Sequence, residues 1–207
     1  MSSKSKTVFF CNQCGYESPK WLGKCPSCNA WNSFVEQTVN TKSSSNAKHR
    51  ETKTVKRLNE ITADESIRIN SKSVELNRVL GGGIVNGSVV LIGGEPGIGK
   101  STLMLQFAMR VKSITSLYVS GEESETQLKL RAQRLGGDGK SCLLLCDTQL
   151  ENIIAQIQQN KPDIVIIDSI QTIQSEHVES YAGSLSQVRE CTAQLINTAK
   201  ENNIPIF

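Results

Sequence analysis

Residues Gly94 to Ser101 read Gly-Glu-Pro-Gly-Ile-Gly-Lys-Ser, which is a complete G-x-x-x-x-G-K-S phosphate loop. The glycines allow a tight backbone wrap in which successive N–H groups point toward a bound phosphate. Lys100 brings a positive charge to the β- and γ-phosphates, and the Ser101 hydroxyl is suited to hold Mg²⁺. We therefore predict that ATP is bound by Gly94, Glu95, Pro96, Gly97, Ile98, Gly99, Lys100, Ser101 and Thr102.

The segments on either side of this loop agree with the motif. Residues 88–94 contain a short β-branched run, which is typical of a buried parallel strand. Residues 102–110 have the pattern of a helix, and the positive end of its dipole would face the phosphates. The alternative is a chance glycine-rich turn, but the order of strand, loop and helix favours a nucleotide site.

Strands and helices continue to alternate beyond the phosphate loop. We predict strands at 116–120, 142–145 and 164–168, and a fifth strand that begins at 204. Helices are expected at 124–135, 150–159 and 185–200. Such alternation indicates a parallel sheet with helices on both faces, so the predicted fold class is α/β with a P-loop NTPase core.

Two acidic residues at strand ends are candidate catalytic groups beside Lys100. Asp168 ends an apolar run, Ile164 to Ile167, and could carry its carboxylate to the Mg²⁺ shell; the alternative is a cap for the next turn. Glu122 follows the 116–120 strand at the edge where ligands bind, so it could orient the attacking water. The alternative is that Glu122 and Glu123 both begin a helix, and we assign only Glu123 to that role.

A polar stretch at residues 171–183 leaves the sheet at the same edge. It contains Gln171, Gln174, His177 and Tyr181, and Gln187 follows shortly after it. A solvated loop is one interpretation, and contact with a polymeric partner is the other.

Four cysteines near the N-terminus form two C-x-x-C pairs, Cys11 with Cys14 and Cys25 with Cys28. Gly15 and the residue after the second pair, Asn29, tolerate the positive φ that such turns need. Two facing turns predict a tetrahedral Cys₄ site for Zn²⁺, with an iron–sulfur cluster as the alternative. Trp21 and Trp31 flank the second pair, and we favour packing over the metal turns rather than stacking on nucleic-acid bases.

The remaining composition sets the domain plan. The chain has 207 residues, a net charge of +3 and 38% hydrophobic residues, with no apolar stretch of membrane-spanning length. We expect a zinc ribbon at 1–35, a flexible basic linker at 36–60 and the ATPase core at 61–207. A cytoplasmic protein without membrane contact is expected, and Cys142, Cys146 and Cys191 should be small buried hydrophobes.

Taken together, these motifs closely resemble the bacterial RadA (Sms) family. The matching segments include Cys11 to Gly15, Lys20 to Cys28, Leu91 to Thr102, Tyr118 to Ser124 and Asp168 to Thr172. The resemblance implies a RecA-like, DNA-dependent ATPase of recombinational repair that promotes strand exchange and branch migration. It implies homo-oligomeric rings on single-stranded DNA, branched recombination intermediates as substrates and a RecA-type recombinase as a partner. It also assigns Glu122 to water activation and residues 171–183 to DNA contact.

Members of this family continue beyond the position of Phe207 with more of the core sheet and a further domain. The resemblance therefore implies a C-terminally truncated RecA-like core. A KaiC-like ATP-binding regulator without DNA motor activity is the alternative function, and a binding module without turnover is a third. The zinc ribbon favours the repair interpretation.

Overall fold

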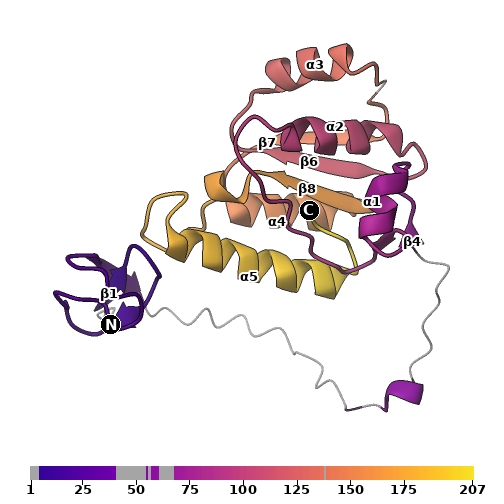
Figure 1. The fold of residues 1–207 in the computed structure, drawn as a ribbon. Coiled ribbons are helices and arrows are strands. Elements are labelled where there is room, and N and C mark those ends of the chain that lie inside the picture. The colour runs from indigo at the N-terminus through magenta and orange to yellow at the C-terminus, as the bar shows by residue number, and fades with distance from the viewer. Residues whose placement is uncertain (1–4, 41–54, 56, 61–67, 138) are drawn as a thin grey trace. The chain divides into compact units, whose positions relative to one another are not determined.

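The computed structural model describes residues 5–40, 55, 57–60, 68–137 and 139–207 (Figure 1). The chain divides into two compact units, Met1–Ile67 and Arg68–Phe207. Each unit has its own hydrophobic core. The predicted linker at 36–60 lies mostly outside the described residues.

The smaller unit is a three-stranded antiparallel sheet in the order β2-β1-β3. Strand β1 (Ser5–Cys11) lies between β2 (Glu17–Ser18) and β3 (Phe34–Asn40). Its buried cluster consists of Cys11, Cys25 and Phe34, with a few partly buried neighbours. A core of this size cannot offset the entropy of ordering the backbone, so a bound metal would have to supply much of the stability.

Strand β3 extends to residue 40, into the segment that the sequence predicted as linker. Its pairing with β1 runs without a break from Cys11 opposite Phe34 to Ser5 opposite Asn40. The polar composition of residues 36–40 suggested a tether, but β1 offers this backbone a continuous set of hydrogen-bond partners, and the strand continues. Farther along, a single 3₁₀ turn covers Leu58–Glu60.

The larger unit contains a parallel sheet in the order β7-β6-β8. Strand β6 (Ser116–Ser120) is central and entirely buried, β7 (Cys142–Cys146) lies at one edge, and β8 (Ile164–Asp168) lies on the other side. All three were predicted, to within one residue. Because the register places Ser120 opposite Asp168, both strands end at the same edge of the sheet.

The prediction of a strand at 88–94 is wrong in length. Only Val89 forms a β-bridge, to Ile206, and Ile206 also bridges Val165 of β8. The segment predicted to begin a fifth strand therefore lies between the phosphate-loop segment and β8. Residues 205–207 exchange backbone hydrogen bonds with β8, but residues 88–90 are bonded to this sheet only through Ile206. No regular ladder therefore extends over residues 88–94, although the order of segments in the sheet is defined.

Helices cover both faces of this sheet, as the alternation predicted (Figure 1). Helices α2 (Lys100–Arg110) and α3 (Glu125–Arg134) lie on one face, and α4 (Leu150–Asn160) and α5 (Leu185–Asn202) lie on the other. Each face has its own buried cluster. Helix α3 begins with a capping box, in which Ser124 and Gln127 satisfy each other's backbone N–H groups.

A short antiparallel pair and one helix precede the phosphate loop and were not predicted. Strand β4 (Arg68–Ile69) pairs with β5 (Ile84–Val85), and α1 (Val74–Val79) lies between them in the chain. Gly83 makes the pairing possible, because its φ is +140° and a Cβ there would lie 2.9 Å from the Ile69 carbonyl oxygen. Two-residue strands carry too little pattern to be seen in a sequence.

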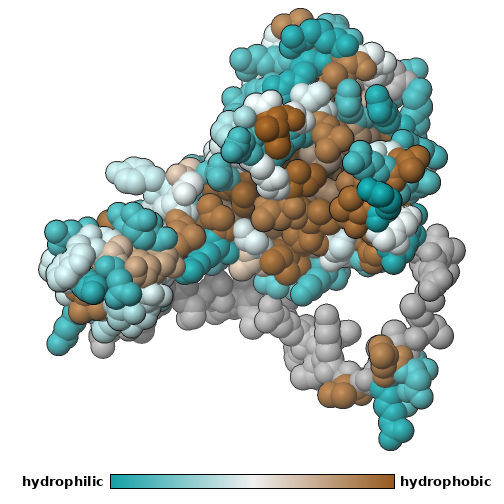
Figure 2. Space-filling view, in the orientation of Figure 1, coloured by the Kyte–Doolittle hydropathy of each residue, from teal (hydrophilic) through white to brown (hydrophobic). Residues whose placement is uncertain are grey.

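The surface of the larger unit carries hydrophobic residues that are not enclosed by described elements. Figure 2 shows them gathered on one face of this unit. The exposed large hydrophobic side chains of the larger unit include Leu91, Ile98, Leu143 and Leu144.

The expectation that Cys142, Cys146 and Cys191 are all buried holds for Cys191 alone, because β7 is an edge strand that leaves Cys146 exposed.

Candidate functional site

The phosphate-loop residues form an exposed turn that leads directly into helix α2. Gly97 has φ +80° and Gly99, the N-cap of α2, has φ +99°, so both occupy the left-handed region that favours glycine. A Cβ on Gly94 would lie 2.5 Å from Ile98 Cδ1, but this atom is the tip of an exposed side chain that can rotate away, so the strict need for glycine falls on Gly97 and Gly99. Two of the three glycines of this loop are therefore required by their backbone conformation.

The loop exposes a set of backbone donors. Among the residues that the structure describes, none accepts a hydrogen bond from the N–H groups of residues 97–102. Three of these groups belong to the first turn of α2, where no intrahelical acceptor exists. Free N–H groups at a helix N-terminus are a binding site for an anion such as a phosphate.

Lys100 lies across this loop. Its Nζ donates to the Gly94 and Glu95 carbonyl oxygens, both at 2.8 Å. The lysine charge is therefore held against the backbone of the phosphate loop. It would have to exchange these carbonyls for phosphate oxygens if a nucleotide entered.

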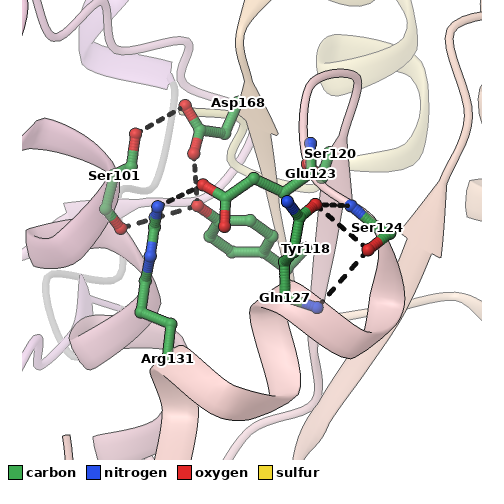
Figure 3. Close-up of polar contacts among 8 residues, drawn as sticks. All are labelled: Ser101, Tyr118, Ser120, Glu123, Ser124, Gln127, Arg131 and Asp168. Atoms are coloured by element: carbon green, nitrogen blue, oxygen red, sulfur yellow. Dashed lines mark hydrogen bonds and ion pairs between the residues drawn. The ribbon is translucent and has the colours of Figure 1, made fainter. Parts of the chain in front are cut away.

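Asp168 meets the phosphate loop at the carboxyl edge of the sheet (Figure 3). Ser101 Oγ donates to Asp168 Oδ1 at 3.0 Å, and the Tyr118 hydroxyl donates to Asp168 Oδ2 at 2.5 Å. Burial, and then the hydrogen bond to Asp168, raise the pKa of Tyr118 well above its ordinary value. A serine hydroxyl and a carboxylate oxygen side by side are ligands that Mg²⁺ prefers, so the site fits that ion.

Glu122 and Glu123 have separate surroundings. Glu122 is exposed and accepts a hydrogen bond from Ser169 Oγ at 3.2 Å, next to Asp168. Glu123 forms an ion pair with Arg131 of α3 and lies just before the cap of that helix (Figure 3). Glu123 therefore lies one residue before the N-cap of α3, and its carboxylate ties this turn to the helix.

The polar stretch at 171–183 is held in place by a residue outside it. Gln187 is 1% exposed; its side-chain oxygen accepts from Ser175 N–H, and its nitrogen donates to the carbonyls of Ser175, Val178 and Ser180. Gln187 is thus a structural anchor, which its polar sequence context did not reveal. The loop that it holds presents Tyr181, which is 93% exposed.

The four N-terminal cysteines converge in the smaller unit. All four Sγ atoms lie within 4.8 Å of one another, with Cys11 and Cys28 at 3.6 Å and Cys14 and Cys25 at 3.5 Å. A tetrahedral zinc with Zn–S bonds of about 2.3 Å would place its sulfurs roughly 3.8 Å apart. The cluster therefore fits Zn²⁺.

The turns of this cluster have the predicted form. Gly15 has φ +70° and donates its N–H to the Cys11 carbonyl, and Asn29 has φ +60° and donates to the Cys25 carbonyl. Each pair of cysteines thus bends around one side of the cluster. The two turns present their thiols from opposite sides, which is the arrangement of a four-cysteine metal site.

Charge explains why the cluster needs a cation. Burial raises the pKa of Cys11, but hydrogen bonds, foremost that of Ser33, outweigh it and lower the value to about 6. A backbone hydrogen bond from Ala30 lowers the pKa of Cys28, but burial and the neighbouring thiols raise it to about 12. Thiols this close cannot all ionise unless a cation balances them, and a divalent metal does so.

Both tryptophans of the smaller unit are exposed. Trp31 is 71% exposed with Lys24 Nζ 5.6 Å from its ring centre, and Trp21 is 53% exposed with its ring over Gly23. The predicted packing over the metal turns is therefore not seen for Trp31, whose ring contacts Lys24. The base-stacking alternative stays a prediction.

Fold and site together define the class of protein. The larger unit is a P-loop ATPase domain of the KaiC and RecA type, preceded by a four-cysteine zinc ribbon. The family model of the KaiC ATPase matches residues 48–143, and a model described as a rubredoxin metal binding domain matches residues 9–36.

Curated relatives narrow the class. The chain is 48% identical to DNA repair protein RadA of Bacillus subtilis (strain 168) and 49% identical to those of Listeria monocytogenes and Streptococcus pyogenes serotype M6. Each match covers 99% of this chain and 46% of the relative. The chain is thus homologous to RadA along nearly its whole length and spans about half the length of these relatives, which confirms the resemblance drawn from the motifs.

No helix in the described part of the chain is both long and apolar enough to cross a lipid bilayer.

Proposed function

We propose that this chain is a DNA-dependent ATPase of recombinational DNA repair, located in the cytoplasm. The observation that carries the ATPase part is the contact of Ser101 with Asp168, which joins the phosphate loop to a strand-end carboxylate. The repair role is supported by relatives that are named DNA repair protein RadA.

In this proposal residues Gly94 to Thr102 bind the phosphates of ATP. The free N–H groups of residues 97–102 donate to phosphate oxygens, and the Lys100 side chain leaves the Gly94 and Glu95 carbonyls to bind the β- and γ-phosphates. Ser101 and Asp168 hold Mg²⁺, which when bound neutralises charge on the phosphates.

Glu122 is the catalytic carboxylate of this proposal. It orients a water molecule whose oxygen attacks the γ-phosphorus while the bond to the bridging oxygen breaks, giving ADP and inorganic phosphate. The water proton is taken up by Glu122 and then released to solvent. Ser169, which donates to Glu122, fixes the carboxylate toward the site.

The proposal also covers a structural metal site and the binding partners of the chain. Cys11, Cys14, Cys25 and Cys28 hold a structural Zn²⁺. Single-stranded DNA and branched intermediates are the proposed substrates, with residues 171–183 as a contact loop, a homo-oligomeric ring as the assembly and a RecA-type recombinase as a partner. Strand exchange and branch migration would be the outcome of ATP turnover on these structures.

Turnover with and without DNA tests this function. We expect the 207-residue chain, and more so a version extended to the length of its relatives, to hydrolyse ATP faster with single-stranded DNA. The match to the KaiC model supports a second candidate, a KaiC-like ATP-binding regulator. ATP binding with turnover that ignores DNA in both versions would favour that regulator and contradict the motor.

A further inference from the structure

Tyr118 occupies the middle of the central strand and faces helix α2. On β6 the alternate residues Ser116 and Tyr118 contact α2: Ser116 Oγ donates to the Ala108 carbonyl at 3.0 Å, and Tyr118 belongs to the cluster on that side. Leu117 and Val119, which alternate with them, belong to the cluster on the opposite face. The tyrosine is therefore placed beneath the start of α2, the helix that carries the phosphate loop.

Its hydroxyl reaches the nucleotide site from below. Tyr118 is fully buried, yet its oxygen lies 2.5 Å from Asp168 Oδ2 and 3.5 Å from the Ser101 carbonyl oxygen. The other carboxylate oxygen, Oδ1, faces Ser101 Oγ at 3.0 Å. Figure 3 shows the three side chains converging from β6, β8 and α2. Each Asp168 oxygen therefore has its own partner.

The two oxygens of the Asp168 carboxylate therefore have different contacts. We propose that Tyr118 is a positioning residue, whose hydroxyl holds Asp168 Oδ2 so that Oδ1 is presented to Mg²⁺ beside Ser101. The inference rests on the proposed nucleotide site and deepens it. Without the phenol the carboxylate would be free to rotate about its last bond, and the metal site would lose its fixed oxygen.

A purely structural role makes a different prediction. A buried tyrosine needs a partner for its hydroxyl, and in a purely structural role Asp168 would serve only as that partner. Packing in the cluster on the α2 face uses only the ring, which phenylalanine keeps. Burial keeps the phenol protonated, so the donor is fixed at every ordinary pH. The two roles therefore differ in the affinity for Mg²⁺, not in folding.

The test is a Mg²⁺ titration of nucleotide binding. The 207-residue chain and Tyr118→Phe are mixed with a fluorescent N-methylanthraniloyl ATP, first in EDTA and then with rising Mg²⁺. We expect the Mg²⁺ concentration at half-maximal binding to rise about 10-fold to 100-fold in the variant, with unchanged affinity in EDTA. Ser116→Ala is the matched control, because it removes a buried hydroxyl from the same face of the same strand; it should titrate like the original chain.

Two results would overturn the inference. One is an unchanged Mg²⁺ midpoint in Tyr118→Phe, and the other is an equal shift in Ser116→Ala. An Asp168→Asn background adds a check, since Tyr118→Phe should produce no further shift there if it acts through that carboxylate. Failure of the proposed function would give a different result. The original chain would show a thermal unfolding transition, and so be folded, but would bind the analogue no better with Mg²⁺ than in EDTA.

Discussion

Ser101 Oγ lies 3.0 Å from Asp168 Oδ1, although the two residues are 67 positions apart in the chain. The parallel sheet explains this contact. Strand β8 ends at the carboxyl edge of the sheet with Asp168, and helix α2 begins above that edge with the phosphate loop.

Glu122→Gln should stop turnover without preventing ATP binding. The amide can still accept from Ser169 but cannot take a proton from water, so we expect ATP hydrolysis to fall about 100-fold or more. A phosphate-release assay measures this. Glu123→Gln is the control, because its carboxylate pairs with Arg131 and should keep most of the turnover. Unchanged hydrolysis in Glu122→Gln would remove Glu122 from the catalytic role.

Replacing Cys25 and Cys28 by serine should abolish metal binding by the smaller unit. The remaining two thiols cannot hold a tetrahedral zinc, so elemental analysis should fall from about one zinc per chain to none. Because the core of Arg68–Phe207 is separate, ATP binding should persist. Cys146→Ser, an exposed cysteine outside the cluster, should keep the zinc. Iron in the unchanged chain would refute the zinc assignment.

Tyr118 should make stability depend on pH in the alkaline range. Its pKa in the folded chain is raised above the unfolded value of about 10, so folding is unaffected by this group below that pH. Above that pH, the phenol of Tyr118 loses its proton in the unfolded chain but keeps it in the folded chain. The free energy of unfolding therefore falls as pH rises. Tyr118→Phe should show a smaller loss between about pH 9 and 11 in urea denaturation. Equal losses in the two proteins would contradict the buried, protonated phenol.

Gln187→Ala should loosen the loop at 171–183. The substitution leaves the N–H of Ser175 and three loop carbonyls without their buried partner, which should cost about 2 kcal/mol and speed amide hydrogen exchange in the loop. Gln194→Ala in the same helix removes a side chain that donates to Glu190 one turn away, and should cost about 0.5 kcal/mol. Equal exchange rates in both variants would show that the loop does not depend on Gln187.

The sequence predicted the elements whose pattern is local. The apolar runs of β6 and β8, the glycines of the phosphate loop and the paired cysteines each carry their own signal, and the structure places them as expected. Parallel alternation also predicts that Ser120 and Asp168 lie at one edge.

The features that could not be predicted from the sequence depend on contacts between residues that are far apart in the chain. The strand at 88–94 shortens because its pairing passes through Ile206, more than one hundred residues later. The exposure of Cys146 follows from the edge position of β7, and the burial of Gln187 follows from a loop folding over it. Tyr118 was part of a recognised motif, but its contact with Asp168 exists only after β6 and β8 pair.

The central claim is that the phosphate loop binds ATP with Mg²⁺. Isothermal titration calorimetry of the folded, zinc-loaded chain with ATP and Mg²⁺ tests it most directly, with Lys100→Ala as the comparison. The account predicts saturable binding by the chain, a loss of about 100-fold or more in affinity for Lys100→Ala, and equal zinc in both. A folded, zinc-loaded chain that gives no binding heat, or a variant with the same affinity, would contradict it.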